Sequence, residues 1–176
     1  MDIEGILREV GTPEPVAKDP PKARRRTQDN VEREWTLPGF GPLTRITTSL
    51  GDVPAQALRE RDMVRTRSGD FKPIVWLDRI VLDEEFLSFH PDALPVHIKP
   101  NALGRGVPSH DVFLAPRQPI APQANKLTGT YSDGALNLIG RPGVFRKAEA
   151  MYTYTLFHLG EPAVVQTSKM FVEINP

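Results

Sequence analysis

Glycine and proline divide this chain into short segments, and their spacing is the strongest constraint on its fold. The chain has 18 prolines and 13 glycines among its 176 residues. Turn-like stretches such as SLGDVP, RSGDF, GRGVP and GRPGVF separate runs that are rich in β-branched and aromatic residues. Because proline in a sheet is confined to edges, first positions and bulges, this pattern predicts an all-β protein. The predicted strands lie within residues 44–50, 62–70, 72–82, 94–100, 111–116, 151–159 and 162–174.

Helical signals are short. No long helical period interrupts the predicted strands, and only PAQALRE and DEEFLSF are suited to one or two helical turns each.

The first 35 residues differ in composition from the rest of the chain. Their stretch TPEPVAKDPPKARRRTQDNVERE is rich in proline and charge and has few large apolar side chains. It buries too little surface to offset the entropy that is lost on ordering. We therefore predict an N-terminal extension at residues 1–35, disordered when alone, and one β domain at residues 36–176. Deleting the extension should barely change the stability of the domain.

Two groups of side chains in the extension are suited to binding. The apolar residues of the first ten positions fall at helical spacing, but so short a helix is marginal in water unless it docks on something. A frayed terminus is the alternative interpretation. A basic cluster follows, with acidic residues on both sides that make a nucleic-acid role unlikely. We predict contacts with other protein subunits through Ile3, Ile6, Leu7 and Val10 of the stripe and through Lys22, Arg24, Arg25 and Arg26 of the cluster.

Composition excludes several classes of function. Lysine plus arginine and aspartate plus glutamate number 22 each, so the whole chain has no strong field for nucleic acid or anionic membrane. The absence of cysteine excludes disulfides, thiolate zinc sites and thiol nucleophiles. No apolar run approaches the roughly 18 residues of a membrane span, and the acidic start is unlike a signal peptide. A cytoplasmic location is favoured, although the compartment itself is left open.

The four histidines do not form a ligand pattern that is typical of metal sites. His90 and His97 bracket the stretch HPDALPVH, whose spacing matches no known zinc motif. Ser109, His110 and Asp111 have the side chains of a hydrolase triad, but neighbours on an extended chain point to opposite faces. We expect neither a metal nor a cofactor.

Several motifs, in order, resemble the Hedgehog/intein (Hint) domain family, in particular its bacterial branch. The opening GFGPLTRITTSLGDVPAQALRERDMVRTRSGD is similar to the start of that domain. The stretches HPDALPVHIKP, ALGRGVPSHDVFL and APRQ match its middle, and YTYTLFHLGEPAVVQTSKMF resembles its last pair of strands. The resemblance covers residues 39–176. It implies a disc-shaped β fold with the start and end of the domain close together.

The resemblance also implies a chemistry that this chain does not retain. Active Hint domains begin with a cysteine or serine that attacks the preceding carbonyl, and a threonine and a histidine assist by twisting and protonating the amide. Gly39 stands at the nucleophile position and Gln118 at the histidine position, so both are vestigial. Thr44 matches an inner strand position. The His-Asn ending of inteins is absent, because Ile174 precedes Asn175.

These observations predict a non-catalytic Hint-like domain, a structural or interaction subunit of a larger assembly. Two alternatives stay open. The domain is a self-processing enzyme that cleaves its peptide bond with an unrecognised nucleophile, or it is a nucleic-acid-associated accessory protein acting through its basic cluster.

Overall fold

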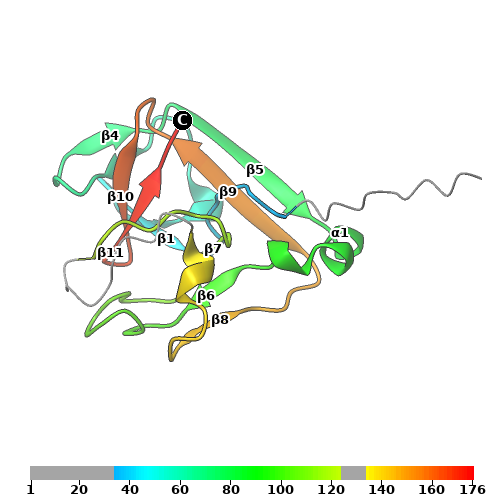
Figure 1. Cartoon of the computed structure of the whole chain (residues 1–176). Coiled ribbons are helices and arrows are strands. Elements are labelled where there is room, and N and C mark those ends of the chain that lie inside the picture. Colours follow the sequence, from blue (N-terminus) through cyan, green and yellow to red (C-terminus); the bar gives the residue numbers. More distant parts are fainter. Residues whose placement is uncertain (1–33, 124–133) are drawn as a thin grey trace, which may run out of the picture. The chain divides into compact units, whose positions relative to one another are not determined.

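A computed structural model describes residues 34–123 and 134–176 of the chain (Figure 1). Residues 34–176 form one compact unit. Glu34 and Trp35, which sequence assigned to the extension, therefore belong to the folded domain. The eight predicted partner-binding residues lie outside the described residues.

The domain is built almost entirely from antiparallel strands, which confirms the all-β class. One sheet has the order β11-β10-β1-β3-β4, with β2 paired to β1. A second sheet pairs β5 with β9, and a third has the order β7-β6-β8. The strands are β1 (Arg45–Thr48), β2 (Gly51–Pro54), β3 (Met63–Arg65), β4 (Phe71–Pro73), β5 (Trp76–Leu82), β6 (Val96–Ile98), β7 (Val112–Leu114), β8 (Val144–Arg146), β9 (Tyr152–His158), β10 (Ala163–Thr167) and β11 (Met170–Ile174).

Helical structure is limited to short elements. The one α-helix of the described residues, α1 (Glu84–Phe89), begins after Asp83, whose side chain accepts a hydrogen bond from the Phe86 amide at 2.8 Å. Three 3-10 turns complete the set: η1 (Ala55–Ala57), η2 (Pro91–Ala93) and η3 (Ala135–Leu138). Both stretches that were suited to helical turns therefore form them. No helix in the described part of the chain is long and apolar enough to cross a membrane.

The end of the domain contains a hairpin that the sequence pattern had merged into one run. β10 and β11 pair along their lengths, with Val165 opposite Val172 and Thr167 opposite Met170. Ser168 and Lys169 form the connection with φ values of 45° and 65°. Such two-residue turns normally use glycine or asparagine, so this one carries no local sequence signal.

Two hydrophobic clusters hold the sheets together. The larger one joins Ile46 and Val165 of the six-stranded sheet to Val96 and Ile98 of β6. The smaller one centres on Tyr154, which is fully buried and donates a hydrogen bond to the Ala93 carbonyl at 2.7 Å. Burial raises the pKa of the Tyr154 hydroxyl well above its usual range. Tyr154 therefore acts as a neutral donor.

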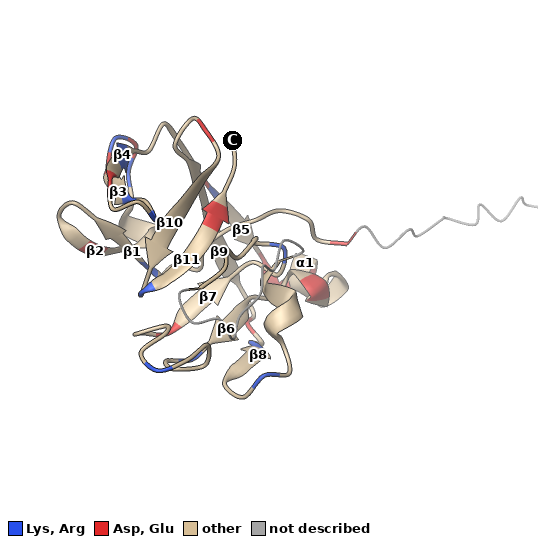
Figure 2. Ribbon diagram, turned by 60° about the vertical axis from the view of Figure 1, so that its left-hand side comes forward, with Lys and Arg blue, Asp and Glu red and all other residues tan. Residues whose placement is uncertain are grey.

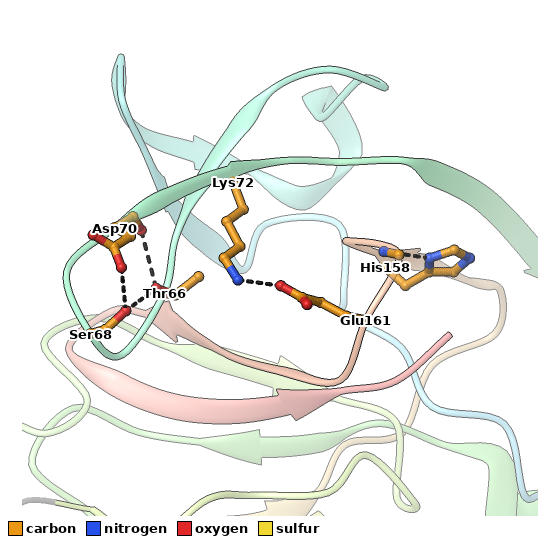
Figure 3. A network of polar contacts seen from close by, with 7 residues as sticks. Thr66, Ser68, Asp70, Lys72, His158 and Glu161 are labelled. Atoms are coloured by element: carbon orange, nitrogen blue, oxygen red, sulfur yellow. Dashed lines mark hydrogen bonds and ion pairs between the residues drawn. The ribbon is translucent and has the colours of Figure 1, made fainter.

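A polar network on the surface ties the β3–β4 hairpin to the turn that follows β9 (Figure 3). The Ser68 hydroxyl donates to the Asp70 carboxylate at 2.9 Å and lies 2.8 Å from the Thr66 hydroxyl. Lys72 forms an ion pair with Glu161, and His158 lies beside the same turn. Each of these polar groups has a partner within the domain, so we interpret the network as structural.

The contacts of Trp35 indicate where the folded domain begins. Its ring stacks on Tyr154 at 6.1 Å and meets the edge of Phe86 at 5.8 Å, and its amide donates to the Asp92 carboxylate at 2.5 Å. Deleting residues 1–33 should leave thermal unfolding unchanged. Deleting residues 1–35, or replacing Trp35→Ala, should lower stability by about 2 kcal/mol. Equal stability of the two truncated proteins, measured by chemical denaturation, would show that Trp35 contributes nothing.

Candidate functional site

Gly39 and Gln118, the two positions that resemble catalytic positions, are in direct contact. The Gly39 amide donates a hydrogen bond to Gln118 Oε1 at 3.0 Å, across 79 residues of sequence. Gln118 is only 2% exposed. The fold therefore brings together the residues that the sequence analysis had selected separately.

Gly39 is held on both sides by backbone contacts. Its carbonyl accepts from the Ala115 amide at 2.9 Å. The next residue, Phe40, exchanges two hydrogen bonds of 2.9 Å with Thr155, and the Gly41 amide donates to Phe113 at 2.8 Å. The start of the domain thus lies between β7 and β9, where its peptide groups have fixed orientations.

Gln118 joins this start to the last strand. Its Nε2 donates to the Glu173 carbonyl at 2.6 Å and, more weakly, to the Pro119 carbonyl at 3.4 Å. The backbone N–H of Gln118 closes the preceding turn by donating to the Ala115 carbonyl at 2.9 Å. The flanking prolines at 116 and 119 restrict the backbone of this turn. Each polar atom of the buried side chain has a partner.

The orientation of the side-chain amide of Gln118 determines what it can do chemically. An amide N–H only donates and a carbonyl only accepts, so the oxygen must face Gly39 and the nitrogen must face Glu173. The group next to the Gly39 nitrogen is therefore a neutral acceptor. It has no proton to give to the peptide bond that precedes Gly39.

The space around Gly39 is filled by Tyr154. A β-carbon on Gly39 would lie 2.9 Å from Tyr154 Cβ and 3.3 Å from its Cγ and Cδ1. Real side chains essentially never show a contact below 3.0 Å, and the atoms here belong to the inflexible base of a buried tyrosine. Any side chain at position 39, including a nucleophile, requires the backbone or Tyr154 to move.

Thr44 has a structural role in β-strand pairing. Its hydroxyl donates to the Phe113 carbonyl and accepts from the Phe113 amide, both at 2.9 Å. The residue is completely buried. These two bonds occupy the hydroxyl, and Thr44 lies directly before β1, which begins at Arg45.

A cleft of about 350 Å³ opens beside the contact between Gly39 and Gln118. Residues from the start and the end of the domain line it together, among them Pro38, Gly39, Ile174 and Asn175. This arrangement agrees with the expectation that the start and end lie close together. The remaining walls are mostly apolar.

His158 and Trp76 form one side of the cleft. Their rings stack at 5.4 Å, and Trp76 is 42% exposed. His158 Nδ1 accepts from the Gly160 amide at 3.1 Å, so in the neutral ring the proton lies on Nε2. Sequence reasoning did not place this histidine in the cleft, because only the pairing of β9 with β5 brings it beside Trp76.

Arg117 connects the turn at residues 115–119 to the start of the domain. Its Nη2 pairs with Glu34, while its buried Nε has no partner among the described residues. The two polar residues of the motif APRQ thus both tie the turn to distant segments. Arg117 reaches residue 34 and Gln118 reaches residues 39 and 173.

The other histidines have structural neighbours. His97 Nε2 lies 2.7 Å from the Asp111 carboxylate, and its ring stacks on Phe113 at 4.3 Å. His90 lies against Phe86 at 4.5 Å. Within residues 34–123 and 134–176, no three histidine, aspartate or glutamate side chains gather as metal ligands would.

Comparison with known proteins agrees with this arrangement. The family model described as "Hint domain" matches residues 38–174. The chain belongs to the Hint domain family. The matched region of this Hint domain begins one residue before Gly39 and includes Gln118 and Glu173.

Solved structures of inteins are similar to this Hint domain at low sequence identity. The gp41-1 intein has a TM-score of 0.49 and 8% identity, over 77% of this chain and 98% of that chain. The MchDnaB-1 intein has a TM-score of 0.45 and 11% identity, over 77% and 99% of the two chains. A variant of the AceL NrdHF class 3 split intein has a TM-score of 0.45 and 14% identity, over 78% and 98%. No curated protein matches the chain significantly.

Sequence reasoning missed a second glutamine that acts like Gln118. Gln123 is 6% exposed, donates to the Phe171 carbonyl at 2.9 Å and accepts from the Phe171 amide at 2.8 Å. The two glutamines lie five residues apart and both bind β11. Only the resemblance singled out Gln118, and no pattern in the sequence marks Gln123.

Replacing Gln118→Leu should cost about 2–4 kcal/mol, because it leaves the Gly39 amide and the Glu173 carbonyl without their side-chain partner. Gln123→Leu is the matched control, since it also removes bonds to β11 but leaves Gly39 untouched. Hydrogen exchange followed by NMR should become faster at the Gly39 amide in the Gln118 variant alone. Equal exchange at Gly39 in both variants would mean that Gln118 does not protect this peptide group.

Proposed function

We propose that this chain is a Hint domain without self-cleaving activity, which acts as a structural or interaction subunit. The observation that supports this proposal best is the hydrogen bond from the Gly39 amide to Gln118 Oε1. Active family members cleave the peptide bond before the position that matches Gly39. In this chain, the nitrogen of that peptide bond donates a hydrogen bond to a neutral side chain.

Three requirements of the family's chemistry are unmet at this contact. Position 39 has no side chain to attack the Pro38 carbonyl. A side chain there would collide with Tyr154. The group that faces the amide nitrogen is an acceptor, so it cannot protonate the leaving nitrogen. Restoring self-cleavage would require all three features to change. This favours a complete absence of self-cleaving activity over a weakened activity.

The same contacts are suited to a rigid binding module. Gln118 fastens the start of the domain to its last strand, and Gln123 adds a second connection nearby. We propose that the extension attaches this module to other protein subunits. Its proposed contact residues are Ile3, Ile6, Leu7 and Val10, together with Lys22, Arg24, Arg25 and Arg26.

The purified chain should therefore stay intact. Incubation with a thiol reductant or with hydroxylamine, followed by intact mass spectrometry, should show only the full-length mass. The reagents cleave thioesters and esters, so they reveal an acyl shift that water alone leaves hidden. A fragment that begins at Gly39 would establish self-processing and refute the proposal.

Restoring the two vestigial side chains should not restore cleavage. Gly39→Cys introduces a β-carbon that meets Tyr154 at 2.9 Å, so this variant should lose stability whether or not Gln118→His accompanies it. We expect the double variant to give no thiol-dependent fragments by mass spectrometry. Leu50→Cys is the control for an added thiol, because Leu50 is 90% exposed. Efficient cleavage of the double variant would show that Tyr154 moves to accommodate the new side chain, and that two substitutions are enough to restore self-cleavage.

A further inference from the structure

An exposed aromatic side chain lies within an acidic surface at α1. We define the α1 face as residues 83–92, which comprise Asp83, α1, His90 and the first two residues of η2. Phe89 at the end of the helix is 75% exposed. Phe86, His90 and Glu85 line a shallow hollow beside it. Among the described residues no ring or cation stacks on Phe89, whereas Phe86 lies against both Trp35 and His90.

The α1 face has four carboxylates and no lysine or arginine. Figure 2 shows the acidic colour concentrated at α1. Asp83 caps the helix and Asp92 accepts from the Trp35 amide, so both have structural partners. Glu84 and Glu85 are exposed, and neither has an ion-pair partner among the described residues.

Arg146 is a cation that lies against the α1 face. Arg146 donates to backbone carbonyls of residues 91, 92 and 94, the shortest bond being 2.8 Å to Asp92. Arg117 pairs with Glu34. Among the described residues, four carboxylates and one adjacent arginine leave the α1 face with a net negative charge next to the exposed ring of Phe89.

Helix stability explains only part of this arrangement. Carboxylates in the first turn of a helix favour its positive end, which accounts for Glu84 and Glu85. It does not account for Phe89, which contributes little to a core when three quarters of its surface is exposed. A single exposed apolar residue is common, and Leu50 at 90% exposure is one. At Phe89 the exposed ring and two unpaired carboxylates coincide.

We propose that the α1 face binds an arginine-bearing segment of a partner protein. A guanidinium group stacks on an aromatic ring and at the same time forms two parallel bonds to a carboxylate, which matches Phe89 beside Glu85. Lysine offers a point charge and lacks the planar surface for both contacts. The inference rests on the proposed binding function and assigns that function a surface and a partner chemistry.

Fluorescence anisotropy with the full chain tests this proposal. The probes are two labelled peptides of glycine and serine, one with two arginines and one leucine, the other with lysines in place of the arginines. The arginine peptide should bind more tightly, and its affinity should fall as salt is added. No binding of either peptide, or equal binding of both, would overturn the assignment.

Variants locate the contact. Phe89→Ser, and separately Glu84→Gln with Glu85→Gln, should each weaken binding of the arginine peptide by about three- to fivefold. The matched controls are Leu50→Ser, an equally exposed apolar residue, and Glu60→Gln, an exposed carboxylate elsewhere. Neither control should change the affinity. The two test variants act by different contacts, so misfolding of one leaves the other informative. Equal losses in the controls would overturn the proposal.

The chain's own basic cluster is the competing occupant. If that cluster covers the α1 face, replacing Lys22, Arg24, Arg25 and Arg26 by glutamine will strengthen peptide binding, and the partner assignment will be overturned. Unchanged binding in this variant supports a separate partner. Intact mass measured on the same samples keeps the two proposals apart, because cleavage before Gly39 refutes the loss of activity without affecting the affinity for the peptide.

Discussion

The side-chain amide of Gln118 is the contact on which the arrangement of this domain depends. It is buried and joins three segments that are far apart in sequence: the start at Gly39, the turn at residues 115–119 and the last strand at Glu173. A buried amide is stabilising only when its donors and its acceptor all have partners. Each of the three segments therefore depends on the position of the other two.

The same contact fixes which chemical group faces the peptide bond that precedes Gly39. A group that protonates the amide before residue 39 has to present a donor, whereas Gln118 presents an oxygen. Tyr154 fills the space that a side chain at Gly39 would need. Its ring also stacks on Trp35, and its hydroxyl is bonded to Ala93. The lack of room at Gly39 is thus part of the packing of the smaller core around Tyr154.

The exposed side chains of this domain differ between the cleft beside Gly39 and the surface at α1. The cleft next to Gly39 is lined by prolines and by the stacked pair of Trp76 and His158. At α1, by contrast, Phe89 is left exposed beside carboxylates that have no ion-pair partner in the described part of the chain. Under the proposed binding function, this exposed surface is the one that another protein would contact.

Sequence alone determined the all-β class and the positions of most strands, because glycine and proline punctuation and strand composition are local properties. Gly39 and Gln118 were selected by the resemblance to the Hint domain family. Sequence did not determine what Gln118 does or that Gln123 acts like it, since their partners lie about fifty or more residues away. It also missed the turn at Ser168, whose backbone conformation is imposed by the pairing of β10 with β11. The lack of room at Gly39 arises only when β9 lies beside the start of the domain, and that juxtaposition is a property of tertiary structure.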